Sequence, residues 1–483
     1  MAGELTLEDR FAGCLLAGAC GDALGEPVEL LDLDQIFQEY GPLGTRELNI
    51  TVDGKATFTD DTQMTLFTAE GLLSTILSLF FSNRDLRTFQ AEDALPGLHQ
   101  SYLRWLATQS EESQSPLFNE IKDRGMLVNE EGLQHRRGPG QTCRMSLKSG
   151  AVGTTYNEIN QSKGCGGIVR VAPCGLFVHG AFSFYSPNEK AELAFKLGCL
   201  AAAITHTHPS GWLSSGCLAA IISRILSGDM LVHAINQTIE LVENEPNHEE
   251  TLNKMVEAKQ LALEFLREFE ETEPTNEAEF LKQKVVLKHF ESLGRGLVSE
   301  DALGISLYCT LITQKDRDVE QALRYSVNHS GGSDSTGAIT GNLVGALYGE
   351  AAIPRKWTDS IEMRDLIREV CRDLLYVNIA NNKQHLALKY PPPITMVNGE
   401  DYYKNRDNLL VPLKMPPGSR VLVVSIIAAG SRGISHKQVQ VLQYPALGRA
   451  SPKEPWKYER ARWFFNTLGR DILWSLDESQ HYS

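Results

Sequence analysis

Cysteine is scarce in this 483-residue sequence, which has nine cysteines and no Cys-x-x-Cys pair. This pattern gives no sign of a disulfide framework, so we expect reduced thiols and a cytoplasmic protein. Long apolar runs are also missing, since no stretch approaches the roughly 18–20 consecutive residues that span a bilayer. The start, Met-Ala-Gly-Glu-Leu-Thr, lacks the basic residues that open a signal peptide. We therefore expect neither a membrane segment nor a secretory signal.

Basic residues are outnumbered by acidic ones, 46 to 61, which gives a formal net charge of −15. That balance argues against general nucleic-acid binding by the whole surface. The charge is uneven: from Asp401 onward there are 12 basic and 7 acidic residues, so the first 400 residues carry about −20. Apolar residues make up 42% and charged residues 22%, which is ordinary globular usage and excludes disorder and fibrous repeats.

The sequence predicts three regions. Residues 1–383 favour helices with glycine-rich junctions, and within them about 240–296 forms a charged helical insertion of one or two amphipathic helices. Residues 384–418 are rich in proline and polar residues, which is the composition of a linker. Residues 419–483 favour two strands and a helix, a small α/β appendage. We expect an all-α domain followed by this appendage.

Glycine recurs at every fourth position in one helical segment, at Gly341, Gly345 and Gly349. In a membrane this spacing would suggest helix dimerisation, but the segment is too short and too polar. We therefore predict a buried helix in which one face lacks side chains and can pack closely against a neighbour.

Two short segments, more than 270 residues apart, carry clustered oxygen ligands. Residues 57–64, Thr-Phe-Thr-Asp-Asp-Thr-Gln-Met, precede an apolar helix, and residues 328–337, Asn-His-Ser-Gly-Gly-Ser-Asp-Ser-Thr-Gly, precede the glycine-stepped helix. Single Asp, Ser or Thr residues at such positions are usually N-caps. One cap, however, needs only one side chain. Hard oxygen ligands at two helix starts suit Mg²⁺ or Mn²⁺, and a two-metal hydrolytic centre follows if the fold brings the segments together.

Beyond these segments, the sequence resembles the ADP-ribosylglycohydrolase family, which includes the dinitrogenase reductase-activating glycohydrolases. The matching stretches follow the family order over about residues 10–380 and leave the tail uncovered. They are GACGDALGEPVE (18–29), TFTDDTQMTLFTAEGLL (57–73), RGPGQTCRMSLKSG (137–150), SKGCGGIVRVAPCGLF (162–177), THTHPSGWLSSG (205–216) and NHSGGSDSTGAITGNLVGALYGE (328–350).

The resemblance implies an orthogonal all-α domain with two Mg²⁺ ions in a cleft that cleaves the bond between ADP-ribose and a protein side chain. Thr59, Asp60 and Asp61 would ligate one ion, Asp334 would bridge to the second, and Ser335 would complete the second site. The metals would hold the ribose hydroxyls and a water near the anomeric carbon, with an acidic residue taking the water's proton.

The resemblance also marks residues outside the two acidic segments. Glu29 matches a glutamate on a mobile loop beside the metals in part of the family, so with Asp61 and Asp334 it is a candidate catalytic residue. His206 matches a substrate-side histidine in some members, although a lone histidine on a helix is more often structural. Asp22 is expected to cap or brace its loop. The glycine-rich run could present N–H groups to an anion or be an ordinary tight turn, and its candidate substrate-binding residues are Gly164, Cys165, Gly166 and Gly167.

The chain departs from the family pattern at one position. Active members usually read Gly-Asp-Ser-Asp-Ser-Thr where this chain has Gly-Gly-Ser-Asp-Ser-Thr, so Gly332 stands in place of an aspartate. Glycine has no side-chain oxygen, and charge count strongly affects affinity at hard-cation sites. We therefore expect a weakened second site.

Three functional hypotheses follow. The first is a Mg²⁺-dependent hydrolase that removes ADP-ribose from a modified side chain, with arginine as the first choice. The second is a catalytically weak relative that binds ADP-ribose or a modified protein in an immunity or regulatory role. In the third, the basic, tryptophan-containing tail binds a partner such as a toxin, an acidic protein or RNA, although the tail's own core would explain the tryptophans equally well.

Overall fold

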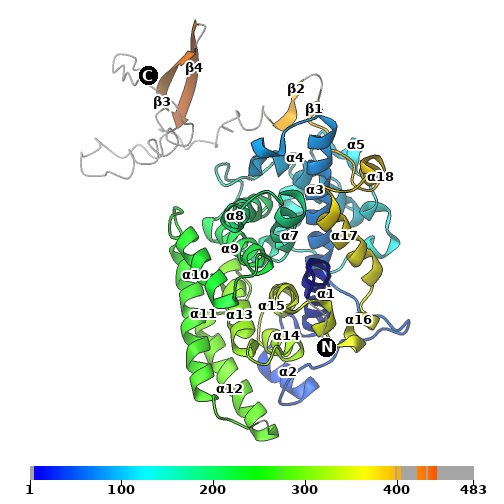
Figure 1. Ribbon diagram of the computed structural model, residues 1–483, viewed down its shortest axis with the longest axis vertical. Helices are drawn as coiled ribbons and strands as arrows, with labels where there is room; N and C mark the ends of the chain where they lie inside the picture. The colour runs from blue at the N-terminus through cyan, green and yellow to red at the C-terminus, as the bar shows by residue number, and fades with distance from the viewer. Residues whose placement is uncertain (1–4, 274, 398–399, 404–420, 431–432, 443–483) are drawn as a thin grey trace, which may run out of the picture. The chain divides into compact units, whose positions relative to one another are not determined.

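The computed structural model describes residues 5–273, 275–397, 400–403, 421–430 and 433–442. The chain divides into two units, Met1–Asn408 and Leu409–Ser483. Figure 1 shows that the first unit is built from helices. The predicted all-α fold of this region is confirmed.

The first half of the helical unit contains nine α-helices among its described residues. They are α1 (Leu7–Gly25), α2 (Leu33–Tyr40), α3 (Asp60–Phe81), α4 (Leu95–Thr108), α5 (Phe118–Ile121), α6 (Gln141–Lys148), α7 (Ala172–Ala181), α8 (Pro187–Ala203) and α9 (Pro209–Leu226). Short 3₁₀ turns lie at Glu26–Val28, Leu86–Thr88, Ala91–Ala94, Leu127–Asn129, Glu131–Leu133 and Cys165–Gly167.

The second half continues with helices that return to α1. They are α10 (Leu231–Val242), α11 (Glu249–Glu268), α12 (Asn276–Leu293), α13 (Ser299–Thr313), α14 (Val319–Val327), α15 (Ser333–Tyr348), α16 (Arg355–Ser360), α17 (Arg364–Tyr376) and α18 (Lys383–Lys389), with a 3₁₀ turn at Glu350–Ala352. Two strands of two residues each, β1 (Met396–Val397) and β2 (Glu400–Asp401), pair in antiparallel orientation.

Helices α1 and α15 lie side by side at the centre of this unit, backbone against backbone (Figure 1). A side chain at Gly345 would overlap the carbonyl of Gly13, and one at Gly341 would overlap the carbonyl of Ala17. The predicted tightly packed face of the glycine-stepped helix is confirmed as far as Gly345. Gly349 instead follows the end of the helix with a φ of 78°, a backbone conformation that favours glycine.

Helix α3 is the other central element, and its residues from Asp60 to Leu77 are all buried. By length and composition it could cross a bilayer, although 83% of its most apolar window is buried inside the protein. Its apolar character is therefore explained by its place in the core.

The predicted charged insertion consists of α11 and α12, which pack against α13. One face of each helix is buried, through Met255 and Phe265 on α11 and through Val286 and Phe290 on α12. The opposite faces carry the charged residues. The amphipathic pattern is therefore confirmed, and the Thr275 hydroxyl caps α12 by accepting from the Ala278 N–H.

The predicted linker 384–418 is wrong at its start. Residues up to 389 belong to α18, and the aromatic side chains of Tyr390, Tyr402 and Tyr403 are buried. Gln100 on α4 holds the backbone of Ile394 through two hydrogen bonds, of 2.6 and 3.0 Å. Proline content suggested a linker, whereas the buried tyrosines fix this segment to the core. Residues 404–418 lie outside the described residues.

The second unit contains an antiparallel pair, β3 (Val421–Gly430) and β4 (Gly433–Leu442), with Val421 opposite Leu442. Both strands were expected from the sequence. The helix that the sequence predicts after these strands lies outside the described residues.

The glycine contact between α1 and α15 gives a first prediction. Gly345→Ala should lower the free energy of unfolding by about 1–3 kcal/mol, because the added methyl group forces two backbones apart. The matched control is Gly304→Ala on α13, where the three nearest atoms all belong to side chains, the closest being a methylene of Lys254 at 2.7 Å. The control should cost less than about 1 kcal/mol, because a side chain shifts more easily than a backbone and alanine favours a helix over glycine by a similar amount. Equal effects in urea unfolding would contradict this account of the packing.

Candidate active site

The start of α3 carries the first group of acidic residues. The Thr59 hydroxyl caps the helix by accepting from the Asp61 N–H at 3.2 Å, which explains why the helix begins here. Asp60 follows the cap, and one of its carboxylate oxygens accepts from the Gly140 N–H at 3.2 Å. All three side chains are buried. Capping therefore uses the threonine and leaves two carboxylates for another purpose.

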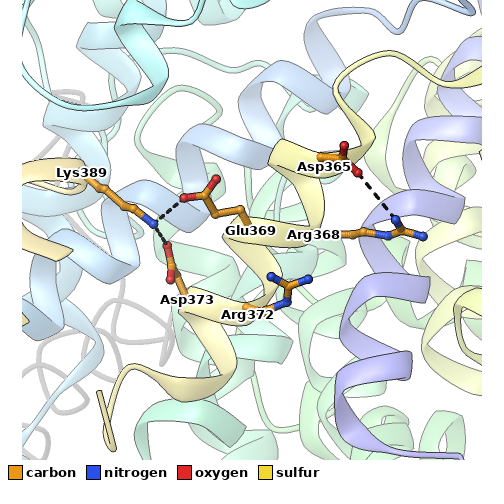
Figure 2. A pocket seen from close by; sticks show the side chains of 6 residues that line it. All are labelled: Asp365, Arg368, Glu369, Arg372, Asp373 and Lys389. Atoms are coloured by element: carbon orange, nitrogen blue, oxygen red, sulfur yellow. Dashed lines mark hydrogen bonds and ion pairs between the residues drawn. The ribbon is translucent and has the colours of Figure 1, made fainter. Parts of the chain in front are cut away.

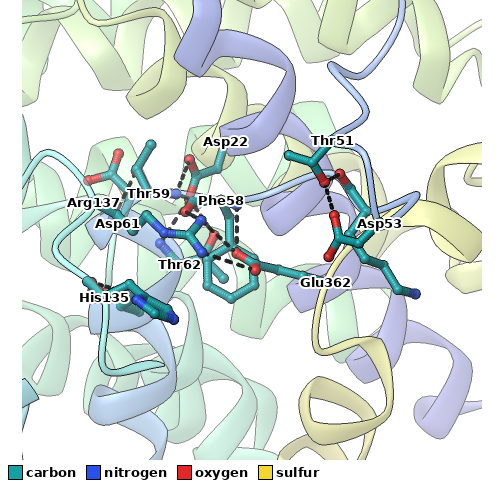
Figure 3. A network of polar contacts seen from close by, with 12 residues as sticks. Asp22, Thr51, Asp53, Phe58, Thr59, Asp61, Thr62, His135, Arg137 and Glu362 are labelled. Carbon is teal, nitrogen blue, oxygen red and sulfur yellow. Dashed lines mark hydrogen bonds and ion pairs between the residues drawn. The ribbon is translucent and has the colours of Figure 1, made fainter. Parts of the chain in front are cut away.

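Asp22, near the end of α1, holds the cap of α3 in place. Its carboxylate accepts hydrogen bonds from the Thr59 N–H at 2.9 Å, from the Thr62 N–H at 3.0 Å and from the Thr62 hydroxyl at 2.5 Å (Figure 3). The sequence predicted that Asp22 braces its own loop, whereas it lies within helix α1 and braces the start of another helix. Asp22 thereby fixes the start of α3 against α1.

The start of α15 meets the start of α3. The Ser335 hydroxyl donates to Asp61 Oδ2 at 2.9 Å, a contact between residues 274 positions apart. Asp334 lies beside it, and its Oδ1 accepts from the Ser335 N–H at 2.7 Å. Gly25 of α1 packs against the Ser333–Asp334 backbone, where a side chain would overlap it. The structure thus brings the two predicted acidic segments together.

The aspartates at this junction share a buried, acidic environment. Burial raises the pKa of Asp22 to about 6, despite the hydrogen bonds that it accepts. Burial raises the pKa of Asp60, Asp61 and Asp334 well above the usual range, and mutual repulsion raises it further. Among the described residues, none of the four forms an ion pair with Lys or Arg. Their charge is therefore uncompensated within this part of the protein.

This donor set fits a hard divalent cation by its chemistry. It consists of carboxylate and hydroxyl oxygens, with the Thr59 hydroxyl still able to use a second lone pair. In the described part of the chain, no group of three or more His, Cys, Asp and Glu side chains is arranged to hold a metal ion. A site here would therefore depend on hydroxyl and water ligands in addition to the aspartates.

Glu29 lies on the loop after α1, half-buried beside the same aspartates. The Leu30 N–H donates to the Gly331 carbonyl at 2.9 Å, which ties this loop to the second acidic segment. Burial raises the pKa of Glu29, and the nearby Glu26 raises it further. Its charge in turn raises the pKa of Asp60, Asp61 and Asp334. The structure therefore brings Glu29 to the cluster.

The glycine-rich run forms the 3₁₀ turn Cys165–Gly167 against the same junction. The Ser335 hydroxyl lies 3.4 Å from Cys165 Sγ, so the turn borders the second acidic segment. The Cys165 N–H is already bound to the Leu297 carbonyl at 3.1 Å and is not available to an anion. His206 is 2% exposed, and its Nε2 lies 3.6 Å from where a Cβ would stand on Gly164 or Gly166. All the predicted substrate-binding residues are thus neighbours.

A loop at 294–299 joins the turn to the second acidic segment, a feature that the sequence analysis missed. Gly332 N–H donates to the Arg295 carbonyl at 3.0 Å, and Ser299 N–H donates to the Lys163 carbonyl at 2.8 Å. A Cβ at position 332 would lie 2.9 Å from the Gly296 carbonyl oxygen. The absent side chain of Gly332 therefore lets this loop approach.

A second missed element is Glu362, which precedes α17. Its carboxylate accepts from the Phe58 N–H at 3.1 Å and forms a two-point ion pair with Arg137, at 3.0 and 3.2 Å (Figure 3). Arg137 also donates to the Phe58 carbonyl at 3.2 Å. Together they fix the backbone just before Thr59. Glu362 belongs to no motif, so only its position in space reveals this role.

A charged hollow of about 440 Å³ lies elsewhere on the helical unit, on α17 and α18 (Figure 2). Its lining pairs bases with acids: Lys389 Nζ lies 3.0 Å from Asp373, and Arg368 lies 3.6 Å from Asp365. None of the predicted site residues lines it. It is therefore separate from the aspartate cluster.

Comparisons with known proteins identify the family. The family model described as ADP-ribosylglycohydrolase matches residues 4–384. A protein of Archaeoglobus fulgidus that is described as uncharacterized is 27% identical, over 76% of this chain and 96% of its own. ADP-ribosylhydrolase ARH3 of Mus musculus is 23% identical over 73% and 87%. ADP-ribosyl-(dinitrogen reductase) glycohydrolase of Rhodospirillum rubrum is 24% identical over 76% and 95%.

The raised pKa values predict how stability depends on pH. A carboxyl whose pKa is raised by folding, as burial and the nearby Asp61 raise that of Asp334, stabilises the protein at low pH, and that contribution is lost as the pH rises through the raised pKa. In metal-free protein at pH 8, Asp334→Asn should therefore raise the melting temperature by about 2–4 °C. Asp359→Asn is the control, since Asp359 is exposed and paired with Arg364. A lower melting temperature for Asp334→Asn would contradict the assignment of uncompensated charge.

Proposed function

We propose, because the chain belongs to the ADP-ribosylglycohydrolase family, that it is a Mg²⁺-dependent hydrolase that removes ADP-ribose from modified arginine side chains. Family membership and the named relatives indicate ADP-ribosyl hydrolase activity in general. The metal and the acceptor are the specific parts of the proposal. The observation that carries it is the hydrogen bond from Ser335 to Asp61, which joins two distant acidic segments at one place.

In this proposal Thr59, Asp60 and Asp61 hold one Mg²⁺ ion, and Asp334 and Ser335 contribute to a second site. Bound Mg²⁺ would orient the ribose hydroxyls and stabilise negative charge on oxygen near the anomeric carbon. The support is electrostatic: the aspartates are buried and, among the described residues, have no Lys or Arg partner. A cation would remove the repulsion that raises their pKa values.

The chain's own residues would move the proton. Glu29 is half-buried beside the cluster, and its raised pKa makes it a stronger base than an exposed glutamate. It would take a proton from water as the oxygen attacks the anomeric carbon. The carbon–nitrogen bond breaks, its electrons go to the guanidine nitrogen, and that nitrogen receives the proton that Glu29 took from the water. The transition state has oxocarbenium character, as in other glycosyl transfers.

Charge complementarity supports arginine as the acceptor. With the aspartates and Mg²⁺ neutralising one another, Glu29 is left as a free carboxylate beside the cluster, and a guanidinium group is cationic and binds carboxylates through a fixed set of N–H donors. A neutral acceptor, such as a serine side chain, would gain less from this environment. The acidic surroundings therefore favour arginine.

Gly332 supports a second candidate function, an ADP-ribose-binding protein with weak or no turnover. Glycine supplies no oxygen, and the Gly296 carbonyl stands 2.9 Å from where a side chain would begin. ADP-ribose could still bind through the first metal site and the glycine turn, because neither depends on a side chain at position 332. This candidate predicts binding of ADP-ribose without release from a modified protein.

The hydrolase proposal predicts a strong effect at Asp61. With mono-ADP-ribosylated arginine as substrate, the wild type should release ADP-ribose in Mg²⁺ and not in excess chelator. Asp61→Asn should lower the rate at least about 100-fold, because both a metal ligand and the partner of Ser335 are altered. Asp359→Asn should leave the rate unchanged. Equal rates with and without Mg²⁺ would overturn the metal dependence, and no release by the wild type would favour the binding protein.

Gly332 can be tested with a pair of variants that share the same steric cost. Both Gly332→Ala and Gly332→Asp place a Cβ against Gly296, so both should displace the 294–299 loop. Only the aspartate adds a ligand. We expect Gly332→Asp to bind Mg²⁺ about tenfold more tightly than Gly332→Ala in calorimetry, and to hydrolyse substrate faster. Identical metal affinity in the two variants would exclude position 332 from the second site.

A further inference from the structure

A buried cation lies directly behind the glycine turn. Arg170 is fully buried, three residues after the turn Cys165–Gly167. Its guanidinium donates to the Ala201 carbonyl at 2.8 Å and to Thr205 Oγ1 at 2.7 Å, and it stands 4.2 Å from the centre of the Tyr102 ring. Among the described residues no carboxylate pairs with it. Because an unpaired buried charge is costly, a specific role for this arginine is expected.

The hydrogen bonds of Arg170 continue to a histidine. Thr205 Oγ1, which accepts from Arg170, lies 2.8 Å from His206 Nδ1. Arginine can only donate, so it occupies one lone pair of the Thr205 hydroxyl. The hydroxyl hydrogen is then free to donate a second hydrogen bond. Two acceptors are within reach, His206 Nδ1 and the thiol sulfur of Cys143, and the ring nitrogen is the stronger of the two. In the neutral imidazole the ring proton is then carried by Nε2.

Nε2 of His206 faces the glycine turn. It stands 3.6 Å from the positions that a Cβ would take on Gly164 and on Gly166, so these glycines keep the space before it clear. The side chain is 2% exposed, and within the described part of the chain no protein atom pairs with Nε2. Among the described residues Nε2 therefore faces the turn without a protein partner, which leaves it open to a ligand.

We propose that Arg170, acting through Thr205, fixes His206 as the Nε2–H tautomer, so that Nε2 donates a hydrogen bond to an oxygen of ADP-ribose lying against Gly164–Gly167. Arg170 and Thr205 are positioning residues here, since neither touches the ligand. The identity of the ligand rests on the proposed function, whereas the tautomer does not. Burial and the Arg170 charge also lower the pKa of His206 to about 3, which keeps the ring neutral while it donates.

Thr205→Val tests the chain of hydrogen bonds because it removes the hydroxyl and keeps the shape. Thr205→Ser is the matched control, which restores the hydroxyl. Nitrogen-15 NMR of histidine-labelled, full-length protein distinguishes the two neutral tautomers, and the His206 signals are assigned by their loss in His206→Gln. We expect the Nε2–H tautomer in the wild type and in Thr205→Ser, and a mixture of tautomers in Thr205→Val. The Nδ1–H tautomer in the wild type, or no change in Thr205→Val, would overturn the proposal.

ADP-ribose binding measured by calorimetry in Mg²⁺ supplies the second readout. Thr205→Val should weaken binding about 3- to 10-fold, and Thr205→Ser should recover it, as expected for one poorly oriented hydrogen bond. If Thr205→Val binds ADP-ribose as tightly as the wild type does, the role assigned to Arg170 and Thr205 is overturned, while the proposed function is unaffected. Failure of the wild type itself to bind ADP-ribose would instead overturn the proposed function and the ligand assigned to His206, and the NMR result would still decide the tautomer.

Discussion

Backbone contact between α1 and α15 is the constraint on which the rest of the site depends. Two helices this close must do without side chains where they touch, and Gly13 and Gly345 meet that requirement at one end. At the other end, Gly25 packs against the Asp334 backbone. The same approach places Asp22 of α1 where it can hold the start of α3. Helix packing therefore sets the distance between carboxylates that lie far apart in the sequence.

The cluster that results is costly for the folded protein. Each of its aspartates is nearly excluded from water, and each raises the pKa of its neighbours. The groups around the cluster fix its backbone but do not neutralise the aspartates. They are the Thr59 cap, the Asp22 brace and the Arg137–Glu362 pair. A rigid acidic site of this kind is suited to bind cations, because the protein has already met the cost of gathering the ligands.

Much of this site could be predicted from residue types alone. Adjacent aspartates between hydroxyl residues exceed what a helix cap needs, and the glycine step of α15 indicated a closely packed face. The partner of that face could not be predicted, because Gly13 and Gly25 lie hundreds of residues away. The roles of Glu362 and of the 294–299 loop could not be predicted for the same reason, since a local sequence pattern does not show which distant residues are in contact. The linker prediction failed at Tyr390, Tyr402 and Tyr403, where burial of aromatic rings outweighed the proline-rich composition.

The central claim is that the starts of α3 and α15 together bind divalent cations beside ADP-ribose. Anomalous diffraction from crystals grown with Mn²⁺ and ADP-ribose tests it most directly, since manganese can be located independently of the protein atoms. The account predicts an anomalous peak within coordination distance of Asp60, Asp61 or Asp334, with the ribose adjacent. A map with ADP-ribose bound elsewhere, or with no manganese at these aspartates, would contradict it.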